Sequence, residues 1–299
     1  AITTLVGNLT NLGTINLGGS GAITGITNHA NGIINLNSSG TISSLINNRN
    51  ATLNIASSTM PTISTLTATA FNNTVNYSGA AQTCKVTVYE NLTLSGSAAK
   101  TFATTPTVNG ILSMEGTASI PSTVVVTYGS AATLQYNKSA SYTATSAEWI
   151  SPFVATGGII IKGTGAITTP GVVQIGDNSN VPLTIESGAT LTPGANLMTL
   201  HGDFINAGTL TSGSGGITLA GTTATQSIAG FTTTGTVSMT KTGGTATFTG
   251  NITGGTLTIN GSGGTLNLGS ALTHTFSVWT RTNGTLNGES STLNLSGNI

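Results

Sequence analysis

A short phrase, in which apolar residues alternate with small polar ones, recurs along the first quarter of the chain. It reads GTINL at 13–17, GIINL at 32–36, ATLNI at 51–55 and NTVNY at 73–77. The phrases end at Leu17, Leu36, Ile55 and Tyr77, so that their spacings are 19, 19 and 22. A period of two is typical of a strand that buries one face. Runs such as GGSG (18–21) and NSSG (37–40) supply turns between the phrases.

A repeat of this length predicts the fold class. It is too short for a propeller blade or a sandwich domain, and it suits one coil of a solenoid made of short strands. We therefore predict an all-β protein, a right-handed parallel β-solenoid (β-helix) with coils of about 19–22 residues. At a strand spacing of roughly 4.8 Å, the 299 residues would form about 15 coils and a rod of roughly 70 Å. Leu, Ile and Val would form inward ladders, and Thr, Ser and Asn outward ones.

The phrases vary in regularity along the chain. Residues 1–70 hold the regular pattern, residues 71–200 are irregular, and residues 201–299 return to regular Gly/Thr-rich phrases such as GTLTI (255–259) and GTLNL (264–268). Only SAEWIS (146–151) suggests a helical turn. Because no Pro-rich or charged linker separates the three blocks, we predict one continuous β-solenoid over residues 1–299.

Composition narrows the class of function. Charged residues make up 5% of the chain, compared with roughly 25% in an average soluble domain, and the formal net charge is zero. The few Lys and Arg residues are scattered, which argues against nucleic acid as a partner. No apolar run approaches the roughly 18–20 residues that a membrane span needs. The first residues, AITTLVGNLTNLG, lack the charged and apolar regions of a signal peptide.

The two ends of the sequence also carry an expectation. The chain begins without Met and in mid-pattern, as a processed product or a piece of a longer chain would. AITTLVGN and TLNLSGNI both read as open strands with no cap. The expected partners are therefore neighbouring repeats of the same polypeptide, or identical subunits stacked end to end into a filament.

Longer phrases resemble a known class of proteins. NNTVNYSGAAQTCKVTVYENLTLSGSAAKTF (72–102), TATQSIAGFTTTGTVSMTKTGGTATFTGNITGG (223–255) and the run from LTINGSGG (257–264) to NLSGN (294–298) are similar to repeat regions of giant secreted surface proteins of the Bacteroidetes, especially flavobacteria. The resemblance implies export by type IX secretion, display on the cell surface, and a role as an adhesin, including in gliding motility. The sorting domain usual in that class is not visible in these residues.

Candidate catalytic chemistry is sparse. A solenoid enzyme acting on polysaccharides needs clustered acids for Ca²⁺ or for acid–base work, together with a Lys or Arg. The acids are scattered turn or strand-edge residues: Glu90, Glu115, Glu148, Asp177, Glu186, Asp203 and Glu289. Asp177 and Asp203 are far enough apart in the sequence that they would approach each other only on neighbouring coils. We predict no enzyme activity, no catalytic residue, no metal site and no cofactor.

Histidines, sequons and threonine arrays add weaker candidates. His29, His201 and His274 lack ligand spacing, and the HGD motif at 201–203 has no third member. Sequons at Asn8, Asn91 and Asn251 are expected by chance in such a composition. TLTAT (65–69) and TATFT (245–249) place hydroxyls about 7 Å apart along a strand, as an ice-binding surface would. The arrays recur only sporadically, which weakens that interpretation.

The single cysteine lies in the most distinctive stretch of the chain, residues 72–102. In QTCKVTVY (82–89) it alternates with Val86 and Val88, which predicts a small inward position and an inert thiol for Cys84. Tyr77 and Tyr89 are expected to fill a wider coil.

Three hypotheses follow from these patterns. The first is a non-catalytic structural and adhesive rod segment of a large extracellular adhesin or filament, which binds surface polysaccharide as one possible partner. The alternative is a carbohydrate-binding or carbohydrate-active β-helix protein. The third is an ice-binding solenoid.

Overall fold

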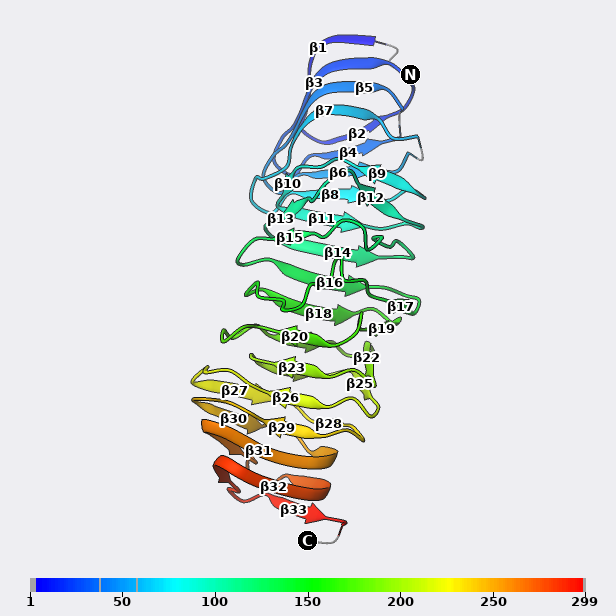
Figure 1. Cartoon of the computed structure of the whole chain (residues 1–299). Coiled ribbons are helices and arrows are strands. Elements are labelled where there is room, and N and C mark those ends of the chain that lie inside the picture. Colours follow the sequence, from blue (N-terminus) through cyan, green and yellow to red (C-terminus); the bar gives the residue numbers. More distant parts are fainter. Residues whose placement is uncertain (1–3, 38, 58, 298–299) are drawn as a thin grey trace. The chain divides into compact units, whose positions relative to one another are not determined.

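The regular structure of the described chain consists of parallel strands, most of them short (Figure 1). The computed structural model describes residues 4–37, 39–57 and 59–297, and in these ranges it contains no helix. The strands stack as a β-solenoid of about 14 turns. This confirms the predicted fold class, at close to the predicted number of coils.

Contacts divide the chain into two compact units, one ending at Ser139 and the other beginning at Ala140. The boundary coincides with neither of the changes in regularity seen in the sequence, at residues 70 and 200. That the solenoid forms one continuous domain over residues 1–299 stays a prediction.

The first unit has one sheet that runs through all its coils, and further sheets on its other sides. The long sheet consists of β2 (Thr14–Leu17), β4 (Ile33–Leu36), β6 (Thr52–Ile55), β8 (Thr74–Tyr77), β11 (Asn91–Leu94), β14 (Ile111–Glu115) and β16 (Thr133–Asn137). The second sheet consists of β1 (Thr4–Asn11), β3 (Ala22–Asn28), β5 (Thr41–Asn47) and β7 (Thr62–Thr67). Two smaller sheets hold β9 (Gln82–Cys84) with β12 (Lys100–Phe102), and β10 (Val88–Tyr89) with β13 (Thr107–Val108) and β15 (Thr127–Tyr128).

The long sheet explains the phrase that recurs in the sequence. Its register places the ends of successive phrases on top of one another, so that the inward ladder runs through Leu17, Leu36, Ile55, Tyr77, Leu94, Met114 and Tyr136. Each of these side chains is at most 5% exposed. Burial of one large apolar side chain contributes about 1.5–3 kcal/mol, so the ladder is a main source of the unit's stability.

The second unit has strands on three sides of each coil. One series consists of β18 (Gly158–Lys162), β21 (Leu183–Ile185), β24 (Phe204–Asn206), β27 (Thr225–Ile228) and β30 (Thr245–Phe248). A second consists of β20 (Val173–Ile175), β23 (Met198–Leu200), β26 (Ile217–Leu219) and β29 (Val237–Met239). The third consists of β17 (Tyr142–Thr143), β19 (Ala166–Thr168), β22 (Thr190–Gly194), β25 (Thr209–Ser212) and β28 (Phe231–Thr232).

In the last coils of the second unit the strands become long and continue around the corners. They are β31 (Ile252–Asn267) and β32 (Thr273–Asn287), and β33 (Thr292–Leu295) pairs with the start of β32. These strands correspond to the regular Gly/Thr-rich phrases at the end of the sequence.

Coil length varies more than the sequence predicted. The coil that runs from Val75 to its partner Leu92 is shorter than the predicted range, whereas the coil that runs from Ile175 to its partner Leu200 is longer. The predicted range of coil lengths was therefore too narrow. The longer coils place their extra residues in corner loops, such as 176–182 between β20 and β21. These loops lie outside the stacked strands, so strand pairing does not limit their length.

Buried asparagines hold the corners of the first unit together. Asn11 Nδ2 donates to Asn28 Oδ1 at 2.7 Å, and Asn28 Nδ2 donates to Asn47 Oδ1 at 2.8 Å. Asn47 Nδ2 also donates to two backbone carbonyls, at Ala51 (3.2 Å) and Thr74 (3.0 Å). All three side chains are at most 2% exposed. This internal amide ladder satisfies carbonyls that the turns would otherwise leave unpaired in the core.

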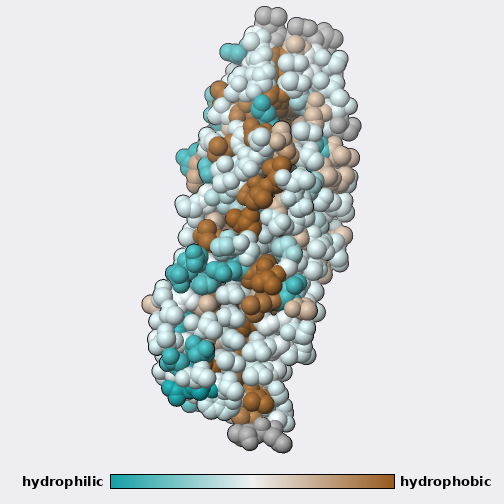
Figure 2. Space-filling view, viewed as in Figure 1, coloured by the Kyte–Doolittle hydropathy of each residue, from teal (hydrophilic) through white to brown (hydrophobic). Residues whose placement is uncertain are grey.

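Outward positions carry small polar side chains. On the long sheet, Asn35 Nδ2 donates to Asn16 Oδ1 at 2.7 Å and Asn54 Nδ2 donates to Asn35 Oδ1 at 2.8 Å, which forms a second amide ladder on the surface. The face shown in Figure 2 is mostly of intermediate hydropathy, with strongly hydrophobic residues gathered in a band along its middle and strongly hydrophilic ones in small groups beside it. The outward ladders predicted from composition are thus present.

The two amide ladders make different predictions for stability. Asn47→Ala leaves the Ala51 and Thr74 carbonyls without their side-chain partner in the core and removes the acceptor of Asn28 Nδ2, so the free energy of unfolding should fall by about 3 kcal/mol. Asn35→Ala is the matched control, because water replaces its partners, and the loss should stay below about 1 kcal/mol. Urea denaturation followed by circular dichroism measures both; equal losses would contradict a structural role for the inner ladder.

Candidate functional site

The stacking of strands on one side of the first unit is interrupted after β7. The sheet that begins with β1 ends at β7, and β9, in the following coil, pairs only with β12. On the opposite side of the same coils the long sheet continues without a gap from β6 through β8 to β11. The interruption therefore lies on one side of the coil, within the stretch that the sequence marks as irregular.

Two tyrosines inside the coil account for the interruption. Tyr77 and Tyr89 are fully buried, and their hydroxyls lie 3.1 Å apart. The Lys85 amide donates to the Tyr77 hydroxyl at 3.0 Å, and the Tyr89 hydroxyl donates to the Lys85 carbonyl. The backbone of Lys85 is thus held from the interior of the coil and not by β7. Both tyrosines are buried as predicted, but the coil from Tyr77 to its partner Leu94, which contains Tyr89, is shorter than the predicted range, so it is not a wider coil.

Side chains occupy part of the free edge of β7. Lys85 Nζ donates to the Ser64 carbonyl at 2.9 Å, and Thr87 Oγ1 donates to the Leu66 carbonyl at 3.1 Å. These contacts protect an edge that would otherwise be open to another strand.

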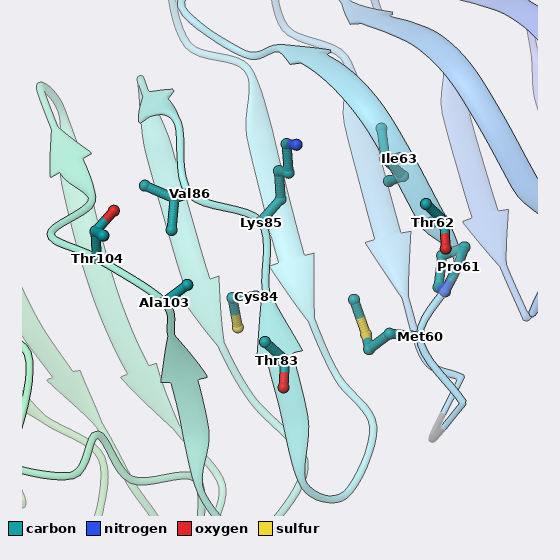
Figure 3. Close-up of a pocket in the computed structure, with 10 residues that line it drawn as sticks. All are labelled: Met60, Pro61, Thr62, Ile63, Thr83, Cys84, Lys85, Val86, Ala103 and Thr104. Carbon is teal, nitrogen blue, oxygen red and sulfur yellow. The ribbon is translucent and has the colours of Figure 1, made fainter.

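A shallow groove of about 370 Å³ lies beside this edge (Figure 3). In Figure 3, residues 60–63 line one side, residues 83–86 lie in the middle, and Ala103 and Thr104 lie on the far side. Its lining combines Met60, Ile63, Cys84 and Val86 with threonines and the single charge of Lys85.

Cys84 lines this groove but is 3% exposed. Burial raises the pKa of the thiol to about 12, and the nearby Lys100 acts only partly against this effect. A thiol is nucleophilic as the thiolate, so this cysteine stays protonated and inert at neutral pH. Cys84 lies inward as predicted, but the alternation on which the prediction rested does not continue, because Val86 is half-buried and Val88 is 39% exposed.

The neighbouring coil contains a polar cluster that the sequence analysis missed. Lys100 is fully buried, and its Nζ donates to the Gly79 carbonyl (2.7 Å), the Ala80 carbonyl (2.6 Å) and Gln82 Oε1 (2.7 Å). Gln82 Nε2 in turn donates to the carbonyls of Ile55 and Ser57 at 2.9 and 3.1 Å. Three oxygens match the three N–H groups of an ammonium ion, so the cluster ties three coils together.

One signal for this cluster exists in the sequence. Lys100 and Phe102 follow the same alternating pattern as Gln82 and Cys84, and the two strands pair in register. A lysine at an inward position is usually interpreted as a solvated charge, because buried lysines are rare unless paired.

The candidate acids of a catalytic site do not form one. Asp203 Oδ1 accepts from the Ser227 amide at 2.8 Å, and the Asp203 amide donates to Asn180 Oδ1 at 2.9 Å, so this residue connects loops of neighbouring coils. Asp177 is exposed on the same side of the solenoid as His201. Asp203 of the HGD motif therefore stabilises loops of the solenoid.

The histidines hold backbone groups. His201 Nδ1 accepts from the Asn178 amide at 3.1 Å; burial lowers the pKa of its imidazole, and the Asp177 carboxylate acts in the opposite direction. His274 is fully buried, with Nδ1 accepting from the Ile252 amide at 3.1 Å. Its Nε2 lies 2.8 Å from the Leu268 carbonyl and therefore carries the proton. His29 is exposed.

The remaining acids are dispersed. Glu148 is buried, which raises the pKa of its carboxyl, and it accepts from the Tyr142 hydroxyl and the Thr145 amide, both at 2.8 Å. The Trp149 amide donates to the Thr145 carbonyl at 3.0 Å, which is the single helical turn expected in 146–151. Of the other acids, Glu115 accepts a hydrogen bond from Ser113, and Glu289 accepts hydrogen bonds from two asparagines. Glu90 and Glu186 lie far from each other in the sequence.

Within the described ranges, no group of three His, Cys, Asp or Glu residues is arranged to hold a metal ion. Those ranges also contain no helix of the length and apolarity that a membrane crossing requires. Two sequon asparagines support the backbone of the next coil: Asn91 Oδ1 accepts from Ile111 and Asn251 Oδ1 from Thr273, both at 2.9 Å, whereas Asn8 is exposed.

The two threonine arrays differ in how they stack. The array at 245–249 belongs to a column in which Thr225, Thr245, Thr265 and Thr285 lie in register on successive coils. In the adjacent column, Asn267 and Asn287 both donate to Glu289. The array at 65–69 has no such column, because Thr67 lies next to Ile46.

In comparisons with known proteins, no family model, no curated protein and no solved structure matches the chain.

The environment of Cys84 predicts slow labelling. At pH 8 the native protein should react with a disulfide reagent at least about 100-fold more slowly than the urea-unfolded chain, because the thiol is both buried and protonated. The thiol's contribution to stability is complete below its unfolded pKa of about 8.5 and is lost as the pH rises towards 12. The labelling rate is measured from the absorbance of the thiolate that the disulfide reagent releases. Ser43→Cys, on an exposed position of β5, is the positive control; equally fast labelling of native Cys84 would contradict this account.

Proposed function

We propose that this chain is a non-catalytic structural and adhesive segment of a large extracellular surface protein. The observation that carries the proposal is the division of polar groups between inside and outside. Outside, neutral amides and hydroxyls repeat from coil to coil, as in Asn16, Asn35 and Asn54. Repeated neutral donors and acceptors suit many weak contacts with hydroxyl-rich partners, which add up along the chain through multivalency.

Inside, the titratable groups serve the fold. The contacts of Lys100, His274 and Cys84 link coils or fill the core, and in the described structure no group of three His, Cys, Asp or Glu residues is placed to hold a metal ion. This use of polar groups supports a scaffold more than an enzyme. The carbohydrate-active alternative draws less support, because Asp203 is bonded to residues of neighbouring loops and Asp177 lies exposed near His201.

The resemblance of residues 72–102 and 223–255 to repeats of flavobacterial surface proteins supports the extracellular part of the proposal. Secretion by the type IX route, an adhesin role in gliding motility, and display on the cell surface belong to the same proposal. A binding partner among surface polysaccharides, and assembly through neighbouring repeats or identical subunits, complete it.

The ice-binding alternative gains one observation, the column of four threonines from Thr225 to Thr285. Against it, the adjacent column changes to Asn267 and Asn287, whose amides are bound to Glu289. It stays a prediction, and thermal hysteresis of a solution of the protein is its check.

Adhesion provides the direct test. Beads that carry the native protein should be retained several-fold more on polysaccharide gels than beads that carry the same protein after unfolding, because unfolding destroys the repeated surface. Retention under flow on alginate, dextran and chitin measures this, together with an assay for released reducing sugar. Equal retention of native and unfolded protein would remove the adhesive role, and released sugar would favour the enzyme.

A further inference from the structure

An exposed aromatic and a guanidinium lie together at one corner of the first unit. Phe71 is 66% exposed, which is unusual in a chain whose other described aromatic rings are largely inside. The Arg49 guanidinium carbon lies 5.2 Å from the centre of the Phe71 ring. The Asn50 amide donates to the Phe71 carbonyl at 3.1 Å, so the backbone fixes the two corners relative to each other.

The guanidinium has unused hydrogen-bonding capacity. In the described structure, neither a hydrogen bond nor an ion pair engages the Arg49 side chain, and its one recorded contact is the ring. The chain has only seven Lys and Arg residues. Two of those in the first unit, Lys100 and Lys138, are buried, and Lys85 is bonded to Ser64. Arg49 is therefore the exposed, unpaired cation among the described residues of this unit.

Two amides complete the corner. Asn50 and Asn72 each follow one member of the pair and both adopt a left-handed backbone, with φ of 56°, which asparagine tolerates. Asn72 Nδ2 donates to Asn50 Oδ1 at 3.1 Å. This contact leaves the side-chain atoms Asn50 Nδ2, a donor, and Asn72 Oδ1, an acceptor. Neither atom has another partner in the described structure.

We propose that this corner, formed by Arg49, Asn50, Phe71 and Asn72, binds an acidic polysaccharide through a uronate residue. The inference rests on the proposed adhesive function and identifies the class of its ligand. The planar guanidinium matches a carboxylate in bidentate geometry. The open part of the Phe71 ring accepts the C–H face of a sugar ring, and the amide donor and acceptor reach neighbouring hydroxyls.

A sugar fits the corner better than an acidic peptide does. A peptide carboxylate would satisfy Arg49 but would leave the flat ring and the paired amides without a matching partner. A pyranose with a carboxylate at one end offers an apolar face, hydroxyls and a charge within one rigid ring. Because the four side chains sit on backbone-paired turns, little ordering is needed on binding.

The experiment compares three polymers and four proteins. Polygalacturonate supplies uronate, dextran supplies neutral sugar, and poly-L-glutamate supplies carboxylates without sugar. Binding of each polymer to the full chain is measured by biolayer interferometry, at low salt and at physiological salt. The variants are Arg49→Gln, Phe71→Leu and, as the matched control, Arg281→Gln, which removes another exposed guanidinium from the second unit.

The wild type and Arg281→Gln should bind polygalacturonate more tightly than either other polymer, and more weakly as salt rises. Arg49→Gln should weaken binding about tenfold, as expected for loss of a charge-assisted contact. Phe71→Leu should weaken it while leaving the salt dependence in place. Circular dichroism and melting of each variant establish that the fold is retained; all three substitutions are at exposed positions.

Four outcomes would overturn the assignment. Equal binding of poly-L-glutamate would mean charge attraction alone, and unchanged binding by Arg49→Gln would place the contact elsewhere. Binding of dextran alone would sink the uronate site and leave the adhesive function standing. Absence of binding to all polymers overturns the site, and if native beads are also not retained on the polysaccharide gels, the proposed function fails with it.

Discussion

Parallel pairing of each coil with the next is the constraint on which this structure depends. It places every side chain directly above its counterpart one coil earlier, at the strand spacing of about 4.8 Å. An inward position must then be filled by residues that stack on themselves, as Leu17, Leu36 and Ile55 do. A polar group at such a position is tolerated only when its neighbours in the stack supply hydrogen bonds, as in the ladder from Asn11 to Asn47. Low charge follows, since like charges would otherwise lie one strand spacing apart.

The same constraint explains why residues 72–102 stand out. Tyr77 and Tyr89 lie inside the coil where β9 does not pair with β7, and their hydroxyls bond the backbone of Lys85 in place of a strand partner. The groove, the protected Cys84 and the buried Lys100 all lie around this interruption. Chemistry that suggests a reactive site in the sequence is thus part of how the solenoid holds two large side chains inside one coil.

Much of the fold was predictable from the sequence because its main signal is local. The alternation of apolar and polar residues inside each phrase predicted the strands and the inward ladder. The interval between phrases predicted the parallel stack. Register between distant phrases was not predictable, since corner loops such as 176–182 change coil length without changing the alternation. The column from Thr225 to Thr285, the contact of Lys100 with Gln82 and the meeting of Arg49 with Phe71 all depend on that register. Dispersal of the acids was predictable because no two of them lie close together in the sequence.

Amide hydrogen exchange at Lys85 tests most directly whether the distinctive residues serve the fold. In the wild type this amide should be protected, because the buried Tyr77 hydroxyl accepts its proton although β7 does not pair with this segment. In Tyr77→Phe its protection should fall at least about tenfold, which corresponds to the loss of one buried hydrogen bond. The Thr74 amide, bonded to the Ala51 carbonyl on the long sheet, should be unaffected. Rapid exchange at Lys85 in the wild type, or equal protection in both proteins, would contradict the account.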